Sequence, residues 1–196
     1  MRASRITLLL LLFLAACGEA PSPLRIGHAV TEQEVAAWNI DVSPGNGGLP
    51  AGRGTVAEGR TIYAQACAGC HGAGGDDGPA PKLRGGRGSL ASAKPLLTIG
   101  SYWPYAETLF DYVRRAMPFD RPGSLGDGQV YAVTAYLLRI NDILAEDSEL
   151  DAQSLPRIRM PNRNGFVLDC GALGLPVQGR PFCRDGRTAS LDKIDD

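Results

Sequence analysis

The chain has 196 residues, with 20 Lys and Arg side chains against 21 Asp and Glu, and its formal net charge is −1. A chain of this length forms one domain of ordinary size with extensions, or at most two small domains. The near-neutral charge and the lack of a long basic run argue against a nucleic-acid-binding protein.

The first residues have the layout of an export signal. A basic start, with Arg2 and Arg5, precedes an apolar run over residues 6–14. That run is too short to span a bilayer as a helix, which needs about 20 apolar residues. We therefore expect residues 1–16 to be the signal peptide of a bacterial protein that is exported to the periplasm.

The sequence LAACG over residues 14–18 resembles a bacterial lipoprotein box. In signals of this kind the cysteine receives the lipid and becomes the first residue of the mature chain. Cys17 is therefore the expected lipidation site, and acyl chains would anchor the protein to a membrane without a transmembrane helix. The alternative is an ordinary signal peptidase site, with Cys17 lost or left as a free thiol.

The rest of the chain predicts a mostly helical domain with irregular extensions. Residues 17–53 are expected to form an extended N-terminal segment rich in Gly and Pro, with one short helix over residues 31–40 that starts with a capping-box pattern. Residues 54–146 are expected to form the domain itself. Residues 147–196, rich in Pro, Arg, Asn and Gly, are expected to form a tail that wraps this domain, the alternative being an arm that binds a partner. No stretch alternates as a β-strand does.

Apolar residues at helical spacing predict three helices in the domain. The first covers residues 54–66. The second covers residues 104–116, with Pro104 at the first helical position. The third begins with a capping-box-like pattern over residues 124–127 and ends near residue 141. The residues expected to face inward are Val56, Gly59, Tyr63 and Cys67 on the first helix, Leu109, Tyr112 and Val113 on the second, and Val130, Val133, Thr134, Leu137 and Leu138 on the third.

Residues 67–71 read CAGCH, which is the attachment pattern of a c-type haem. Two thioether bonds, from Cys67 and Cys70, would fix the porphyrin edge to one turn of chain, and His71 would bind the iron from one side. The alternative is a reduced CxxC pair that binds zinc or acts as a thiol pair. The sequence lacks a second zinc-ligand pair at the usual spacing, so we expect one covalent haem c.

The sixth iron ligand has few candidates. Methionine often takes this position and raises the reduction potential. Apart from the first residue, the chain has Met117 and Met160, and outside the CAGCH motif it has one histidine, His28. We expect Met117, because the chain ahead of the last helix can fold over the open haem face and Pro118 fixes the backbone beside the sulfur. Met160, His28, a cysteine or an open position remain alternatives, as does a role for Met117 in the core.

A largely buried haem carries two propionate groups that need hydrogen-bond donors. Trp103 is the donor that we expect at this place. The other candidates are Arg84, Arg87, Tyr102 and Arg121, each of which is also a common residue of a surface or a core.

Two cysteines remain near the C-terminus, Cys170 and Cys183. In an exported protein such a pair most simply forms a disulfide. The alternative is that one of them binds the iron or carries a persulfide.

These motifs, taken in order, resemble class I cytochrome c. The matching features are GxxxYxxxCxxCH over residues 59–71, PKLRG over residues 81–85, Met117-Pro118, and a last helix with Tyr131 and Tyr136. The resemblance implies an all-α fold of three to five helices around a covalently attached haem. It also implies that the carbonyl of Pro81 accepts the Nδ1 proton of His71, and that the first and last helices cross at Gly59.

A closer resemblance is to the cytochrome subunits of sulfite dehydrogenases and of the sulfane dehydrogenase of the Sox system. The matching segments are GLP at 48–50, GSYWPYA at 100–106, RAMPF at 115–119, YAVTAY at 131–136 and MPNRNGF at 160–166. The resemblance implies a periplasmic electron acceptor that docks on a molybdenum-cofactor subunit and passes electrons to another cytochrome or an oxidase.

The sequence shows no general acid–base pair or nucleophile beside the haem motif, which favours electron transfer over catalysis by this chain. Three other functions are open at this point. The first is a membrane-tethered electron shuttle without a link to sulfur. The second is a haem enzyme that acts on thiosulfate through Cys170 or Cys183. The third is a haem sensor or structural lipoprotein with an open sixth position.

Overall fold

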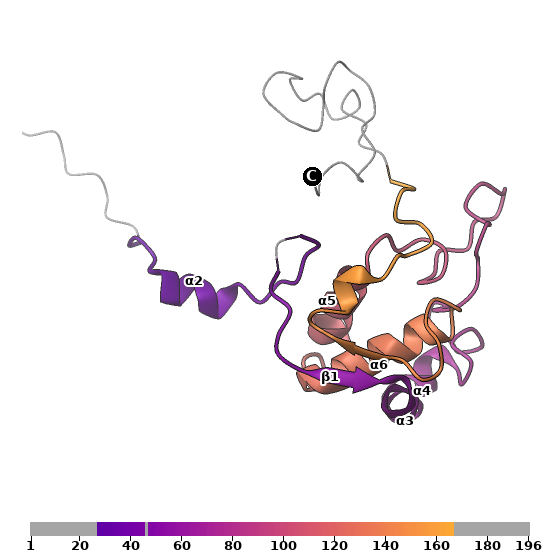
Figure 1. Cartoon of the computed structure of the whole chain (residues 1–196), viewed down its shortest axis with the longest axis horizontal. Coiled ribbons are helices and arrows are strands. Elements are labelled where there is room, and N and C mark those ends of the chain that lie inside the picture. The colour runs from indigo at the N-terminus through magenta and orange to yellow at the C-terminus, as the bar shows by residue number, and fades with distance from the viewer. Residues whose placement is uncertain (1–26, 46, 167–196) are drawn as a thin grey trace, which may run out of the picture. The chain divides into compact units, whose positions relative to one another are not determined.

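The computed structural model describes residues 27–45 and 47–166. The predicted signal peptide, the lipidation site Cys17 and the predicted disulfide partners Cys170 and Cys183 lie outside these residues. The chain divides into two compact units, one up to Ile40 and one from Asp41 onward. Figure 1 shows the elements of both.

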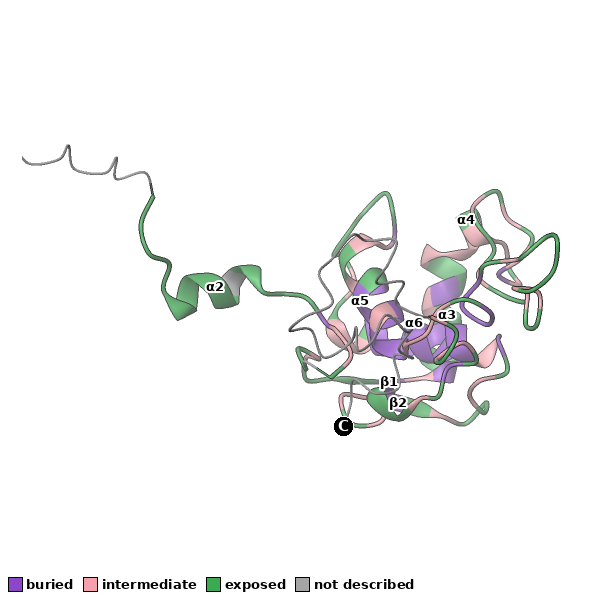
Figure 2. Cartoon of the chain, turned by 90° about the horizontal axis from the view of Figure 1, so that it is seen from above, coloured by how far each residue is buried: buried purple, intermediate pink, exposed green. Residues whose placement is uncertain are grey.

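In the first unit, helix α2 spans Glu32–Trp38. Its start is a capping box, as predicted: the Thr31 hydroxyl accepts the N–H of Glu34 (3.2 Å), and the Glu34 carboxylate accepts the N–H of Thr31 (2.8 Å). The apolar side chains of Val35 and Trp38 are exposed, the latter by 85%, and the helix is green in Figure 2. A helix of seven residues is marginal in water, so the capping box is its main local support.

The second unit is mostly helical, which confirms the predicted fold class. Its elements are β1 (Arg53–Thr55), α3 (Val56–Ala66), α4 (Ala68–His71), α5 (Ala106–Ala116), α6 (Asp127–Arg139), β2 (Glu149–Asp151) and the 3-10 turn η1 (Leu155–Arg157). The two short strands were not predicted. They pair antiparallel, with Arg53 opposite Asp151 and Thr55 opposite Glu149. Three residues are too few to show the alternation by which a strand is recognised in sequence.

Helix α6 is the centre of the core. Every residue from Val130 to Leu138 is buried, and the helix is purple in Figure 2. A helix that is covered on all sides belongs to the middle of a domain. The inward residues predicted for this helix are therefore correct, as are Val56, Gly59 and Tyr63 on α3.

Helices α3 and α6 cross in close contact at Gly59. A Cβ atom on Gly59 would overlap the carbonyl of Ala132 on α6. Beside the crossing, the rings of Tyr63 and Tyr136 lie with their centroids 5.1 Å apart. Gly59 lowers the stability of α3 as an isolated helix, but it lets α3 and α6 approach each other closely. The family resemblance implied this crossing at Gly59.

Three predicted helix starts were wrong. Helix α3 begins at Val56 and not at residue 54, because Arg53–Thr55 form strand β1. Helix α5 begins at Ala106 with Tyr105 as N-cap, so Pro104 lies outside it. Tyr112 was predicted to face inward but is 47% exposed. The N-cap of α6 is Gly126, whose N–H is accepted by the Gln129 side chain at 2.9 Å, and not Ser124.

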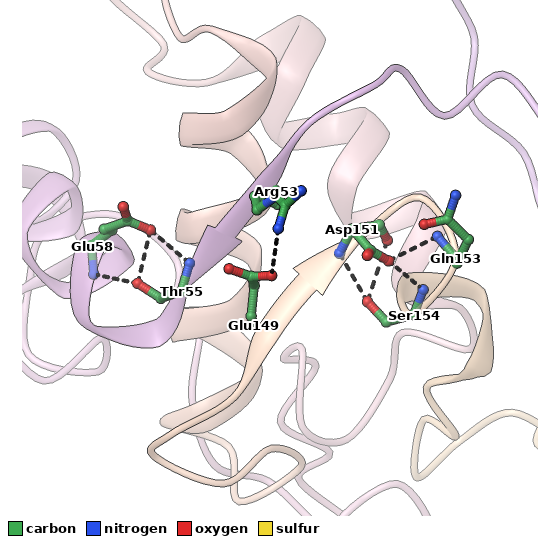
Figure 3. A network of polar contacts seen from close by, with 7 residues as sticks. All are labelled: Arg53, Thr55, Glu58, Glu149, Asp151, Gln153 and Ser154. Carbon is green, nitrogen blue, oxygen red and sulfur yellow. Dashed lines mark hydrogen bonds and ion pairs between the residues drawn. The ribbon is translucent and has the colours of Figure 1, made fainter.

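The strand pair joins the start of α3 to the tail (Figure 3). At one end, the side chains of Thr55 and Glu58 form a second capping box. At the other, a carboxylate oxygen of Asp151 accepts the N–H groups of Gln153 (2.9 Å) and Ser154 (2.7 Å). The chain beyond β2 then packs on the core through Leu155 and Met160, both buried.

Candidate haem site

The CAGCH motif directly follows α3, and its last four residues form the one-turn helix α4 (Ala68–His71). Cys67 ends α3, with its N–H bonded to the carbonyl of Tyr63 at 2.9 Å. The Cys67 carbonyl in turn accepts the N–H groups of Cys70 (3.1 Å) and His71 (2.9 Å). Cys67 is half-buried, Cys70 is exposed, and neither thiol is in a disulfide. Consecutive backbone hydrogen bonds therefore order the turn that carries the two thiols and the imidazole.

The ring of His71 is held through one nitrogen. Its Nδ1 lies 2.8 Å from the carbonyl oxygen of Pro81, the contact that the resemblance implied. A carbonyl can only accept, so Nδ1 carries the proton, and in the neutral ring the lone pair is then on Nε2. A hydrogen bond of this kind fixes the orientation of a metal-binding imidazole.

The loop between His71 and Pro81 is anchored at several points. The Tyr63 hydroxyl donates to the carbonyl of Gly72 (2.8 Å), and the carbonyl of Cys70 accepts the N–H of Ala80 (2.8 Å). Burial, followed by the nearby Cys67, raises the pKa of Tyr63, so this hydroxyl stays a donor. The loop thus returns Pro81 to the imidazole.

Asn141, which sequence reasoning missed, holds the next part of the chain. Its side-chain amide donates to the carbonyls of Leu83 (3.1 Å) and Leu137 (2.9 Å), and its side-chain oxygen accepts the N–H of Gly85 (3.2 Å). The backbone carbonyl of Asn141 accepts from Arg87 at 3.2 Å. The only sign of this role in the sequence is that Asn141 is a polar residue just beyond the end of an apolar helix.

The three candidates for the sixth ligand lie in different surroundings. Met160 is 4% exposed and belongs to the hydrophobic core. His28 lies in the first unit, with Nε2 3.2 Å from a carboxylate oxygen of Glu34. Met117 is half-buried at the end of α5, where its N–H bonds to the carbonyl of Val113 at 3.2 Å, and its peptide bond to Pro118 is cis. Met117 stays the predicted ligand, because Met160 is taken up by the core and His28 lies in the first unit.

The five side chains predicted as possible propionate donors have different neighbours in the structure. Trp103 is half-buried and lies edge-on to Tyr112, with ring centroids 5.7 Å apart. Arg87 donates to Asn141, and Arg121 contacts Asp120 at 3.4 Å. The two remaining candidates are Arg84, which is exposed, and Tyr102, which lies edge-on to Phe166.

The chemistry of these groups fits a covalent haem better than zinc or a thiol pair. Within the described ranges, no cluster of three or more His, Cys, Asp or Glu is placed to hold a metal ion. A reactive thiol pair needs a lowered pKa, whereas burial, together with Cys70, raises the pKa of the Cys67 thiol to about 11. Two unpaired thiols on one turn, beside an imidazole with a fixed Nδ1 proton, are the donor set that haem c requires.

The model of the family described as Cytochrome c matches residues 56–141. A chain in the crystal structure of the sulfane dehydrogenase SoxCD from Paracoccus pantotrophus is 37% identical, with a TM-score of 0.70. The match covers 83% of this chain and 82% of that chain. This chain belongs to the cytochrome c family. Membership confirms the class I cytochrome c fold, the covalently bound haem c and a function in electron transfer.

A second relative of this cytochrome is "Thiosulfate dehydrogenase" of Stutzerimonas stutzeri (strain A1501). The two are 34% identical over 89 residues, which is 45% of this chain and 28% of the relative. This cytochrome thus spans little more than a quarter of that relative's length.

In this cytochrome the bound haem supplies reversible one-electron chemistry. The chain itself attaches the group and orients the imidazole of His71. Cys67 and Ala68 of the motif pack against the hydrophobic core, as do Leu83 and Trp103. Among the residues that the structure describes, no helix is both long and apolar enough to cross a membrane.

Proposed function

We propose that this cytochrome is the electron-accepting subunit of a molybdenum-containing sulfite or sulfane dehydrogenase. It is anchored by lipid at Cys17 and lies in the periplasm of a bacterium. The observation that carries this proposal is the 37% identity to a SoxCD chain over 82% of that chain's length. The export signal and the lipoprotein box of residues 1–18 support the location.

The proposal assigns a role to each predicted site residue. Cys67 and Cys70 form the thioether bonds, and His71 and Met117 bind the iron from opposite sides. The carbonyl of Pro81 holds the imidazole through the 2.8 Å contact to Nδ1. Trp103 is the predicted hydrogen-bond donor to a propionate.

Electrons enter from the molybdenum subunit and leave to another cytochrome or an oxidase. Encounters between redox proteins use small interfaces. A small exposed surface of the cytochrome is therefore enough to dock on each partner. A lipid anchor raises the effective concentration of the cytochrome near membrane-bound partners.

The test uses the complex gently solubilised from its native membrane. We expect molybdenum to co-purify with the haem, and sulfite or thiosulfate to reduce that haem. A Cys17→Ser chain tests the lipid anchor separately: mass spectrometry should find no acyl chain on it, whereas the wild-type chain carries one. A cytochrome without molybdenum, which dithionite reduces and neither sulfur compound does, would instead be a general electron shuttle.

A second candidate function is thiosulfate oxidation by the haem chain itself, with Cys170 or Cys183 as iron ligand or persulfide carrier. The 34% identity to a thiosulfate dehydrogenase favours it. This function predicts a thiolate-ligated haem spectrum, and thiosulfate oxidation by the purified chain without any partner. Loss of both properties in the Cys170→Ser or Cys183→Ser chain would identify the cysteine concerned.

A further inference from the structure

The helix that ends at Met117 is tied to the beginning of the second unit by a buried carboxylate. The Asp111 side chain is 11% exposed. Its Oδ1 accepts the backbone N–H of Val42 at 2.9 Å and the Nε–H of Arg115 at 2.9 Å, and its Oδ2 accepts from Nη2 of Arg115. Val42 itself is 4% exposed and belongs to the core. Three donors therefore converge on one carboxylate.

Arg115 links these groups to the candidate ligand. It lies in the last turn of α5, two positions before Met117. One edge of its guanidinium, with Nε and Nη2, is paired with Asp111, and its Nη1 lies 3.6 Å from a carboxylate oxygen of Asp41. Bidentate arginine–carboxylate pairs hold both groups in a defined geometry, so the last turn of α5 has a fixed position against residues 41–42.

The helical backbone ends directly after this turn. Met117 makes the last helical hydrogen bond, to Val113, and then adopts an extended conformation with φ −123° and ψ 145°. Terminal turns fray when nothing holds them. The direction in which the Met117 side chain leaves the helix therefore depends on the position of the Arg115 turn.

We propose that Asp111 and Arg115, with the N–H of Val42, form a clamp that positions the sulfur of Met117 for the haem iron. Asp111 and Arg115 are positioning residues, which act through the backbone that leads to Met117. The inference rests on the proposed role of Met117 as ligand. Because the same carboxylate holds Val42, the clamp also links residues 41–42 to the ligand.

The clamp is tested by spectroscopy on the full-length holoprotein with the substitution Asp111→Asn. This change keeps the size of the side chain and an acceptor for Val42 but removes the charge that pairs with Arg115. We expect loss of most of the red methionine-to-iron charge-transfer band, a lower reduction potential, and tighter binding of added imidazole to the ferric protein. Arg115→Lys keeps the positive charge but loses the two parallel N–H donors of the guanidinium. It should show the same changes to a smaller extent.

Arg114→Gln is the matched control. Arg114 lies on the same turn of α5 and pairs with Asp127 on α6 at 3.0 Å, so its substitution disturbs an ion pair of the same helix on a different side. We expect the band, the potential and the imidazole affinity to stay at their wild-type values. Equal losses in the Arg114→Gln and Asp111→Asn proteins would overturn the clamp, because they would reflect general loosening of α5.

The Met117→Ala protein separates the clamp from the ligand assignment. If that protein retains the band, Met117 is not the ligand, and both the assignment and the clamp fail. If it loses the band while Asp111→Asn retains the wild-type band and potential, the ligand assignment stands and the clamp is refuted.

Discussion

At the scale of single residues, the fold uses the two methionines of the described chain in different ways. Met160 is 4% exposed and completes the hydrophobic core. Met117 ends α5 with a half-buried side chain, next to the buried Pro118. Removal of Met160 should therefore affect packing, whereas removal of Met117 should affect the iron.

We expect Met117→Ala to abolish the methionine-to-iron charge-transfer band. Met160→Ala should retain the band and lower the free energy of unfolding by about 2–5 kcal/mol, the usual cost of a cavity left by a buried methionine. Absorption spectra of the ferric proteins and denaturant titrations measure the two effects. Loss of the band in Met160→Ala alone would transfer the ligand role to Met160.

The sequence does not distinguish the two methionines by their neighbours. Each is followed by proline, and each has an arginine within two positions before it. What separates them is burial, which depends on how the segment after β2 folds back on the core. By contrast, the attachment motif was predictable, because its chemistry lies within residues 67–71.

The residues that support the site were not predictable. Asn141 bonds to Leu83, 58 positions away, and Asp111 bonds to Val42, 69 positions away. A lone asparagine or aspartate gives no sign of its distant partner. Only the tertiary structure shows which backbone groups lie beside these side chains.

At the scale of elements, the crossing of α3 and α6 depends on the absence of a side chain at Gly59. A Cβ there would overlap the backbone of Ala132. Interiors packed this tightly do not absorb an added methyl group without a shift of the backbone.

We expect Gly59→Ala to lower the free energy of unfolding by about 1–3 kcal/mol, the usual cost of overpacking, although alanine is the better helix former by roughly 1 kcal/mol. Gly69→Ala is the control, because a Cβ at that helical glycine meets no atom of the polypeptide within 4 Å. It should leave stability unchanged or raise it. Denaturant titration measures both, and equal effects at the two positions would refute the close crossing.

The elements themselves were predictable to different degrees. Helix α6 was clear because its apolar pattern runs over several turns, and α2 because its capping box is local. The start of α5 was predicted two residues too early, because the fixed φ angle of Pro104 suits the first helical position. In the structure Tyr105 is the N-cap. The strands β1 and β2 owe their pairing to contacts across the domain and not to their own three residues.

At the scale of the whole molecule, Tyr131 joins the centre of the core to the segment that enters it. Its hydroxyl, on the fully buried side chain, donates to the carbonyl of Pro50 at 2.9 Å. Burial, with smaller contributions from Asp127 and Asp151, raises the pKa of Tyr131 to about 12. The global stability should therefore depend on pH in the alkaline range.

The unfolded chain loses the Tyr131 proton near pH 10, while the folded protein keeps it to about pH 12. Between these values the unfolded state binds fewer protons, so the free energy of unfolding falls as pH rises, by up to about 1.4 kcal/mol per pH unit. Denaturant titrations over this range should show that the stability of wild type falls relative to that of Tyr131→Phe. A difference between the two proteins that does not change with pH would contradict the assigned pKa.

The strand pair brings together the two segments that flank the haem-binding helices. Because β1 and β2 run antiparallel, with Arg53 opposite Asp151, the chain that leads to these helices lies beside the chain that leaves them. Domains whose flanking segments are adjacent tolerate insertion into a surface loop of another protein. An electron relay built from this domain would therefore need a single insertion point, provided that the graft keeps Val42, Leu155 and Met160, which complete the core outside residues 53–151.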